Sequence, residues 1–138
     1  MSKFNDIIRN LEGLRSLAPA AEGDIAAAEQ QLNIHFSAEF KDYLLEFGAI
    51  YSKAVELKGI AKTKGFNVAE VTEKARETDP DFPMDMYVVS ETGINGIIVC
   101  QKEDGTVYEC EPNHDPKIIA SSLYDYVQNI ILLQEKSD

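Results

Sequence analysis

Two histidines are the first residues to consider for catalysis, because a histidine beside a carboxylate can act as a general base. His114 stands next to Asp115 in EPNHDP, and His35 comes just before a predicted helix cap. A base alone makes no active site, since a nucleophile and an oxyanion site are also required. The turn-forming residues of EPNHDP already explain that segment, and we expect a surface or capping role for His35. No nucleophile-elbow pattern surrounds Ser90, Ser121 or Ser122, so none of these serines is a candidate nucleophile. The sequence therefore predicts no catalytic residues and no enzyme.

Possible metal ligands also lack the required spacing. Three aspartates invite comparison with a calcium-binding loop: Asp79, Asp81 and Asp85. An EF-hand needs glycine at its sixth position and glutamate at its twelfth, where this chain has Met84 and Ser90. Cys100 and Cys110 form no CxxC pair, so a structural zinc site is not expected. The segment TGING has too few glycines and no following helix for a phosphate loop, and we expect a turn there. No metal or cofactor is predicted.

The two cysteines flank a predicted hairpin around Asp104-Gly105. A two-residue turn would pair Cys100 with Glu109 and place the sulfur atoms on opposite faces of the sheet. A three-residue loop would return them to one face, displaced along the strands. Because no secretion signal is evident, we expect free, partly buried thiols.

The composition indicates one globular domain spanning residues 1–138. The chain is 44% hydrophobic and 9% aromatic, which argues against disorder. No apolar run approaches the roughly 20 residues of a membrane span, and the N-terminus lacks a signal-peptide pattern. We therefore expect a cytoplasmic protein.

Acidic residues give the chain its clearest chemical character. Aspartate and glutamate total 24 against 13 lysines and arginines, so the net charge is −11. Such a surface repels nucleic acid and anionic lipid and attracts a basic protein, although solubility alone is an equally open explanation. One group follows a single stripe of a predicted helix, and the other surrounds the hairpin. The candidate partner-binding residues are Glu39, Asp42, Glu46, Glu103, Asp104, Glu109 and Glu111.

Hydrophobic periodicity predicts the elements that position these residues. Apolar residues spaced three and four apart predict a helix from Ser2 to Pro19, and further helices over about 23–32, 38–47 and 68–78. Ser37 and Asn67 are expected N-caps, and Asn33 is an expected left-handed C-cap. AVELKGIA predicts a strand, three strands follow in MYVVSE, INGIIVCQK and TVYECEP, and a last helix begins at Ser121 or Ser122. The order predicts an α+β domain with an antiparallel meander flanked by N-terminal helices and a C-terminal helix.

The run IAAAEQQLNIHFSAEFKDYLLEFG resembles the opening signature of the SUKH superfamily. Glu29 and Leu32 fit that signature, Asn33 stands in place of its glycine, and Phe36-Ser37 replaces its leucine-proline. The residues that keep the later spacing are Phe40, Leu44 and Gly48. The resemblance continues through LKGIA, MYVVSETGINGIIVCQKEDGTVYEC and IIASSLYDYVQNIIL, so that it covers about residues 25–133.

This resemblance implies a binding domain without catalytic residues. Many bacterial SUKH proteins are immunity proteins that neutralise polymorphic toxins, many of them nucleases, and some eukaryotic relatives regulate cell-wall synthesis through protein contacts. We therefore predict an immunity protein that binds a basic toxin domain, a nuclease above all, through its acidic surface. The alternative is a non-catalytic regulatory module unrelated to toxins. An enzyme comes third, since it would need a pocket that collects His114, Asp115 and a serine or cysteine.

Overall fold

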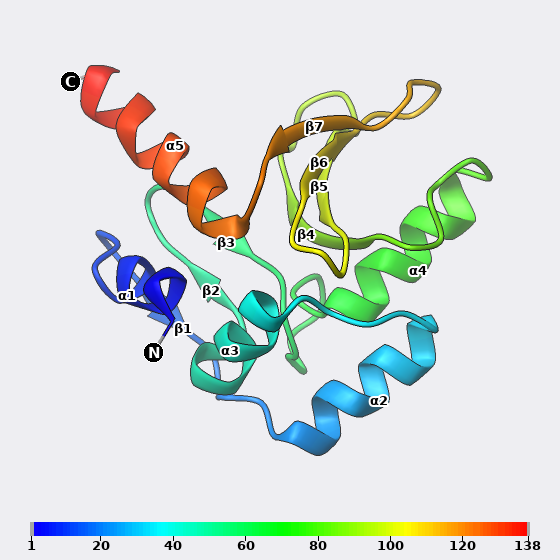
Figure 1. Ribbon diagram of the computed structural model, residues 1–138, viewed down its shortest axis with the longest axis horizontal. Coiled ribbons are helices and arrows are strands. Elements are labelled where there is room, and N and C mark those ends of the chain that lie inside the picture. Colours follow the sequence, from blue (N-terminus) through cyan, green and yellow to red (C-terminus); the bar gives the residue numbers. More distant parts are fainter. Residues whose placement is uncertain (1, 138) are drawn as a thin grey trace.

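The computed structural model describes residues 2–137, which fold into helices and two antiparallel sheets (Figure 1). The helices are α1 (Lys3–Arg9), α2 (Glu22–Leu32), α3 (Ala38–Phe47), α4 (Val68–Thr78) and α5 (Leu123–Ser137). The strands of the smaller sheet are β1 (Arg15–Ser16), β2 (Ile50–Tyr51) and β3 (Glu56–Leu57). The strands of the larger sheet are β4 (Tyr87–Glu91), β5 (Ile98–Gln101), β6 (Val107–Cys110) and β7 (Lys117–Ala120). The predicted α+β class is confirmed.

Most helix boundaries follow the predicted caps. The side chain of Ser37 accepts from the N–H of Phe40 at 3.0 Å, and Asn67 caps α4 through the N–H of Ala69 at 3.0 Å. Asn33 adopts the left-handed conformation with φ 56° at the end of α2. These residues were predictable because each acts within its own turn of the chain.

The first helix is shorter than predicted. It starts at the expected cap, where Ser2 accepts from the N–H of Asn5 at 3.3 Å, but it ends at Arg9. Gly13, with φ 72°, lies in the turn that follows, and Arg15–Ser16 then pair with β2. Leu11 and Leu14 still reach the core, but they do so from the turn between α1 and β1.

The length of the β5–β6 loop determines whether the two cysteines lie on opposite faces of the sheet or on one face. The N–H of Lys102 donates to the carbonyl of Thr106 at 3.1 Å, and Gly105 has φ 99°, so the loop has three residues. Cys100 consequently pairs with Tyr108, and Ile98 pairs with Cys110. Both cysteines therefore lie on one face of the sheet, as free and buried thiols.

The strand β7 was not predicted. Its residues, KIIA, pair with β6 after the turn at EPNHDP, whereas no element was predicted between that turn and the last helix at Ser121 or Ser122. The meander thus has four strands in the order β4-β5-β6-β7.

Both faces of this four-stranded sheet carry apolar side chains. Tyr87, Val89, Val99 and Val107 belong to the main core, which they share with α1, α2, α3 and α5. Side chains of the opposite face, which we call the outer face, pack with Val71 of α4 and with Phe82 in a second cluster. Figure 1 shows α4 and α5 on opposite sides of the sheet. The division follows from strand geometry, since successive side chains point to opposite faces.

Candidate partner-binding surface

Glu39, the first acid of the α3 stripe, is half-buried and makes intramolecular contacts. Its carboxylate accepts hydrogen bonds from the backbone N–H groups of Leu123 at 2.7 Å and Tyr124 at 3.0 Å. The side chain of Gln101 donates to it at 3.3 Å. A carboxylate at these free N–H groups is favourable because the N-terminus of a helix carries partial positive charge. Glu39 therefore joins α3 to α5.

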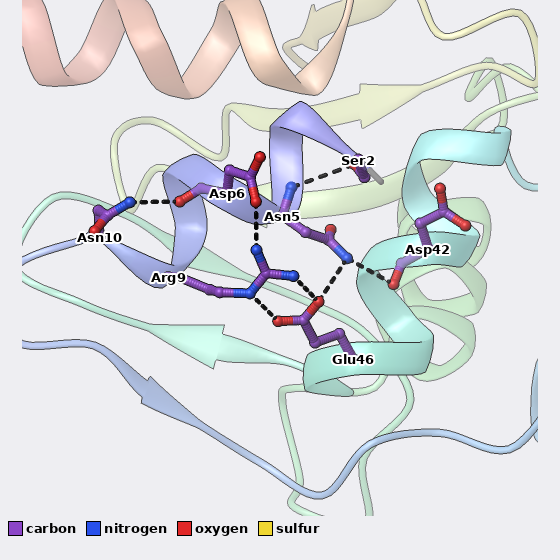
Figure 2. A network of polar contacts seen from close by, with 7 residues as sticks. All are labelled: Ser2, Asn5, Asp6, Arg9, Asn10, Asp42 and Glu46. Atoms are coloured by element: carbon purple, nitrogen blue, oxygen red, sulfur yellow. Dashed lines mark hydrogen bonds and ion pairs between the residues drawn. The ribbon is translucent and has the colours of Figure 1, made fainter.

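Glu46, the last acid of the stripe, connects α3 to α1 (Figure 2). Its carboxylate accepts from both Nε and Nη2 of Arg9, and Asn5 Nδ2 donates to it at 3.2 Å. Arg9 also pairs with Asp6 of its own helix. The hydrogen bond to Glu46 is the main cause of a raised pKa for Arg9. Because its carboxylate already accepts hydrogen bonds from Arg9 and Asn5, Glu46 is only in part available to a partner.

Asp42 is the freest acid of this stripe. Its backbone carbonyl accepts from Asn5 Nδ2 at 3.1 Å, while its carboxylate points away from the network in Figure 2. The structure therefore divides the three acids of one helix face into two that bind neighbouring elements and one that is exposed.

The hairpin acids do not form a single patch. Glu103 and Asp104 lie exposed in the β5–β6 loop, and Asp104 accepts from the N–H of Thr106 at 2.9 Å, which lowers the pKa of its carboxyl group. Glu111 follows the far end of β6, where it lies 3.1 Å from His114 Nδ1. Glu109 is half-buried on the strand between them. The length of β6 thus separates the exposed loop acids from Glu111.

Both histidines are exposed, and each lies near a glutamate: His35 near Glu29 and His114 near Glu111. His114 is exposed, and its Nδ1 lies 3.0 Å from the carbonyl of Pro112 as well as near Glu111. Its neighbour Asp115 is exposed too, and neither residue lines the large cavity described below. Between residues 2 and 137 no group of three histidine, cysteine, aspartate or glutamate side chains could hold a metal ion. Nor does any helix in this range have the length and hydrophobicity to cross a membrane.

A cavity of about 480 Å³ lies between α4 and the outer face of the larger sheet. Val71 and Ala75 of α4 form one wall, and Val88, Ile98 and Cys110 of the sheet form the other. No site residue was predicted here apart from Glu111, which stands at the rim. The signal was present in IIVC, because an unbroken apolar run indicates a strand with apolar surroundings on both faces.

Fold and surface together define a small α+β domain with acidic residues on several elements. A family model described as SUKH_5, SMI1-KNR4 cell-wall, matches residues 4–132, and the chain therefore belongs to the SUKH family. A crystal structure of a protein from Pseudomonas syringae pv. tomato is similar in fold, with a TM-score of 0.74 at 18% identity. That similarity covers 92% of this chain and 95% of the other. No curated protein matches the sequence significantly.

Proposed function

We propose that this SUKH protein is a bacterial immunity protein, which binds a cognate toxin domain and neutralises it. The observation that carries the proposal is the excess of negative charge, −11 over 138 residues, on a domain of this family. Exposed acids without an ion pair to any residue that the structure describes, such as Asp42 and Glu103, support it. A toxin that cuts nucleic acid must hold a polyanion, and an acidic protein is complementary to such a site.

Opposite charges would also speed the encounter. Electrostatic steering raises association rates to about 10⁸–10⁹ M⁻¹s⁻¹ at low salt, against about 10⁵–10⁶ for neutral surfaces. An antidote has to capture its toxin before damage accumulates, so a fast association suits it. Among the predicted partner-binding acids, Glu103 and Asp104 of the β5–β6 loop are exposed, as this role requires.

The test is affinity capture from the native cells, with the purified protein as bait at low and at raised salt. We expect a basic toxin domain that elutes as the salt rises, and coexpression of the bait should then restore growth to cells that produce this toxin. Failure to restore growth in the presence of a captured toxin would contradict the proposal.

The second candidate is a regulatory interaction module unrelated to toxins. The cell-wall description of the matching family favours it. Its partner need not be basic, so the capture should be insensitive to salt. A regulatory protein retained equally at both salt concentrations, without any growth rescue, would support this alternative.

A further inference from the structure

The outer face of the four-stranded sheet is apolar but only partly covered. Val88 and Cys100 are fully buried there, Tyr108 is half-buried, and Ile118 of β7 is 63% exposed. Antiparallel sheets with one solvated face commonly alternate apolar with polar residues, so that the solvated face is polar. Here the side that faces away from the main core is also apolar, and α4 is the helix that packs on it. This arrangement leaves apolar surface beyond the edge of α4.

A cavity under α4 lies on the same face, where Val88, Ile98 and Cys110 line it. Its volume of about 480 Å³ lies within the range of about 300–1,000 Å³ typical of binding pockets. Its apolar walls come from α4, from Phe82 and from the sheet, and it opens to the exterior. Lys102 lies over the ring of Tyr108 at 5.0 Å and so covers the hairpin end of the same face. We call this cavity the outer groove; its apolar lining includes Val71, Ala75, Val88, Ile98 and Cys110.

The rim of the outer groove carries more negative than positive charge. Its acids are Glu70, Asp79, Glu91 and Glu111, and its bases are Lys64 and Lys74. The buried Lys58 lies 2.9 Å from Glu91, but it is shared with Glu56, also at 2.9 Å, so these three residues together keep one negative charge. A partner segment with positive charge is thus complementary to the rim.

We propose that the outer groove binds a segment of a partner protein in which an apolar side chain is flanked by lysine or arginine. The apolar side chain enters the cavity, and the basic residues face the acidic rim. Binding energy at interfaces concentrates in such buried anchors, while rim charges govern encounter and specificity. The inference deepens the proposed function, on which it rests for the toxin as the source of the segment. The chemistry of the groove can be tested without that toxin.

Cys110 is a reporter inside the groove. It lines the cavity and retains 7% exposure, whereas Cys100 on the neighbouring strand is completely buried. Alkylation of the native protein should therefore modify Cys110 first. A segment seated in the groove should slow this reaction, and Cys100 serves as the internal control.

The probe is a fluorescent synthetic peptide with one leucine-phenylalanine pair between two runs of three lysines. One matched peptide has two serines in place of the apolar pair, and the other has glutamates in place of the lysines. Anisotropy at physiological salt should show at least about tenfold tighter binding for the probe than for the serine peptide, because only the probe buries an apolar anchor. The glutamate peptide should not bind. Equal affinity of the probe and serine peptides would overturn the proposal, since charge alone would then explain the binding.

Two variants locate the binding. Ala75→Phe places a large side chain in the wall of the cavity, and Ala27→Phe adds the same ring to an exposed position of α2. We expect Ala75→Phe to remove the preference for the apolar pair and Ala27→Phe to retain it, with circular dichroism confirming that both fold. Should Ala75→Phe fail to fold, protection of Cys110 in the unmodified protein decides: the probe should slow alkylation severalfold, and an unchanged rate would overturn the proposal. Protection that rises with protein concentration in the absence of peptide would do the same, because a second copy of the chain would then occupy the groove.

Failure of the groove and failure of the proposed function have different signatures. If the protein rescues cells from a toxin but the probe leaves Cys110 unprotected, immunity acts through another surface and the groove proposal is wrong. If the probe binds and protects Cys110 but no toxin is neutralised, the groove is correct and its partner is another basic protein.

Discussion

The carboxylate of Glu39 in α3 accepts a hydrogen bond of 2.7 Å from the backbone N–H of Leu123, the first residue of α5. The two residues are 84 positions apart in the sequence. Ser122 caps the same helix locally, through the N–H of Asp125 at 3.1 Å. The start of α5 is therefore held both by its own sequence and by a carboxylate from another helix. The role of Glu39 in partner binding stays a prediction. Its contacts with α5, however, have a direct consequence for stability.

We expect Glu39→Ala to lower the free energy of unfolding by about 2 kcal/mol, because a charge-assisted cap and its helix-terminal contacts are lost. Glu39→Gln should cost less, since its amide oxygen still accepts one of the two bonds. Urea denaturation measures both changes. The control is Glu103→Ala at an exposed loop position, where a change within about 0.5 kcal/mol is expected. Equal stability of the two alanine variants would show that Glu39 does not stabilise α5.

The roles of Glu39 and Glu46 mark the limit of what the sequence could predict. Their spacing placed both correctly on one stripe of α3, because helical periodicity is a local property. Their partners, Leu123 and Arg9, come from segments whose approach depends on the tertiary fold. Two acids that the sequence assigned to a docking face are therefore engaged within the chain.

The same distinction between local and tertiary interactions explains which parts of the fold could be predicted. Caps such as Ser37 and Asn67 were predictable, since each bonds within three residues. Strand β7 was not, because four residues between a turn and a helix carry too little periodicity to be separated from either. The outer groove also escaped prediction, since it forms only where α4 packs against a sheet built from later residues.

The backbone contact between Gly48 and Gly59 provides a second test of the packing. A β-carbon added at Gly59 would lie 1.6 Å from the carbonyl oxygen of Gly48, which accepts from the N–H of Ile60 at 3.0 Å. The backbone would have to shift, so we expect Gly59→Ala to destabilise the protein by about 3 kcal/mol or more. Thermal and urea unfolding measure the loss.

The matched control is Gly23→Ala in α2, where the added carbon has no neighbour within 4 Å. It should stabilise the protein by about 0.5–1 kcal/mol, because alanine favours the helix over glycine. Similar effects of the two substitutions would mean that the close approach of Gly48 and Gly59 does not constrain the fold.

Alkaline pH should destabilise the protein through its buried tyrosines. Burial raises the pKa of Tyr43 well above its usual value of 10.0, and it also raises the pKa of Tyr87. A raised pKa in the folded state means that the stabilisation is complete below pH 10 and is lost above it, where the unfolded chain releases protons that the folded one retains. Each tyrosine then lowers the free energy of unfolding by about 1.4 kcal/mol per pH unit.

Urea midpoints measured between pH 8 and pH 11.5 test this expectation, with the phenolate absorbance recorded alongside. Tyr43→Phe removes one titrating group, so its stability should fall less steeply above pH 10, even though it lacks the hydrogen bond of 3.0 Å to the Leu57 carbonyl. Tyr51→Phe is the control at an exposed tyrosine and should keep the original slope. An unchanged slope in Tyr43→Phe would contradict a raised pKa at that position.

The acids of the β5–β6 loop should act mainly on the rate of partner association. Glu103→Gln with Asp104→Asn removes two exposed charges, and asparagine can still accept from the N–H of Thr106. Stability should therefore stay nearly constant, while association with the toxin slows severalfold at low salt and becomes less salt-dependent. Dissociation should change little, since these exposed loop charges stay solvated in the complex. Stopped-flow or surface-based kinetics over a range of salt concentrations measures both rates.

A double variant of equal charge separates a local effect of this loop from the effect of net charge. Glu22→Gln with Glu135→Gln also removes two exposed acids, from α2 and α5, neither of which lines the outer groove. Because the Debye length is only about 10 Å at 0.1 M salt, charges far from the contact contribute little to steering. Association should thus slow much less in this control than in the loop variant. Equal slowing in both would mean that the partner responds to the overall charge of −11, and the loop acids would then have no special part in binding.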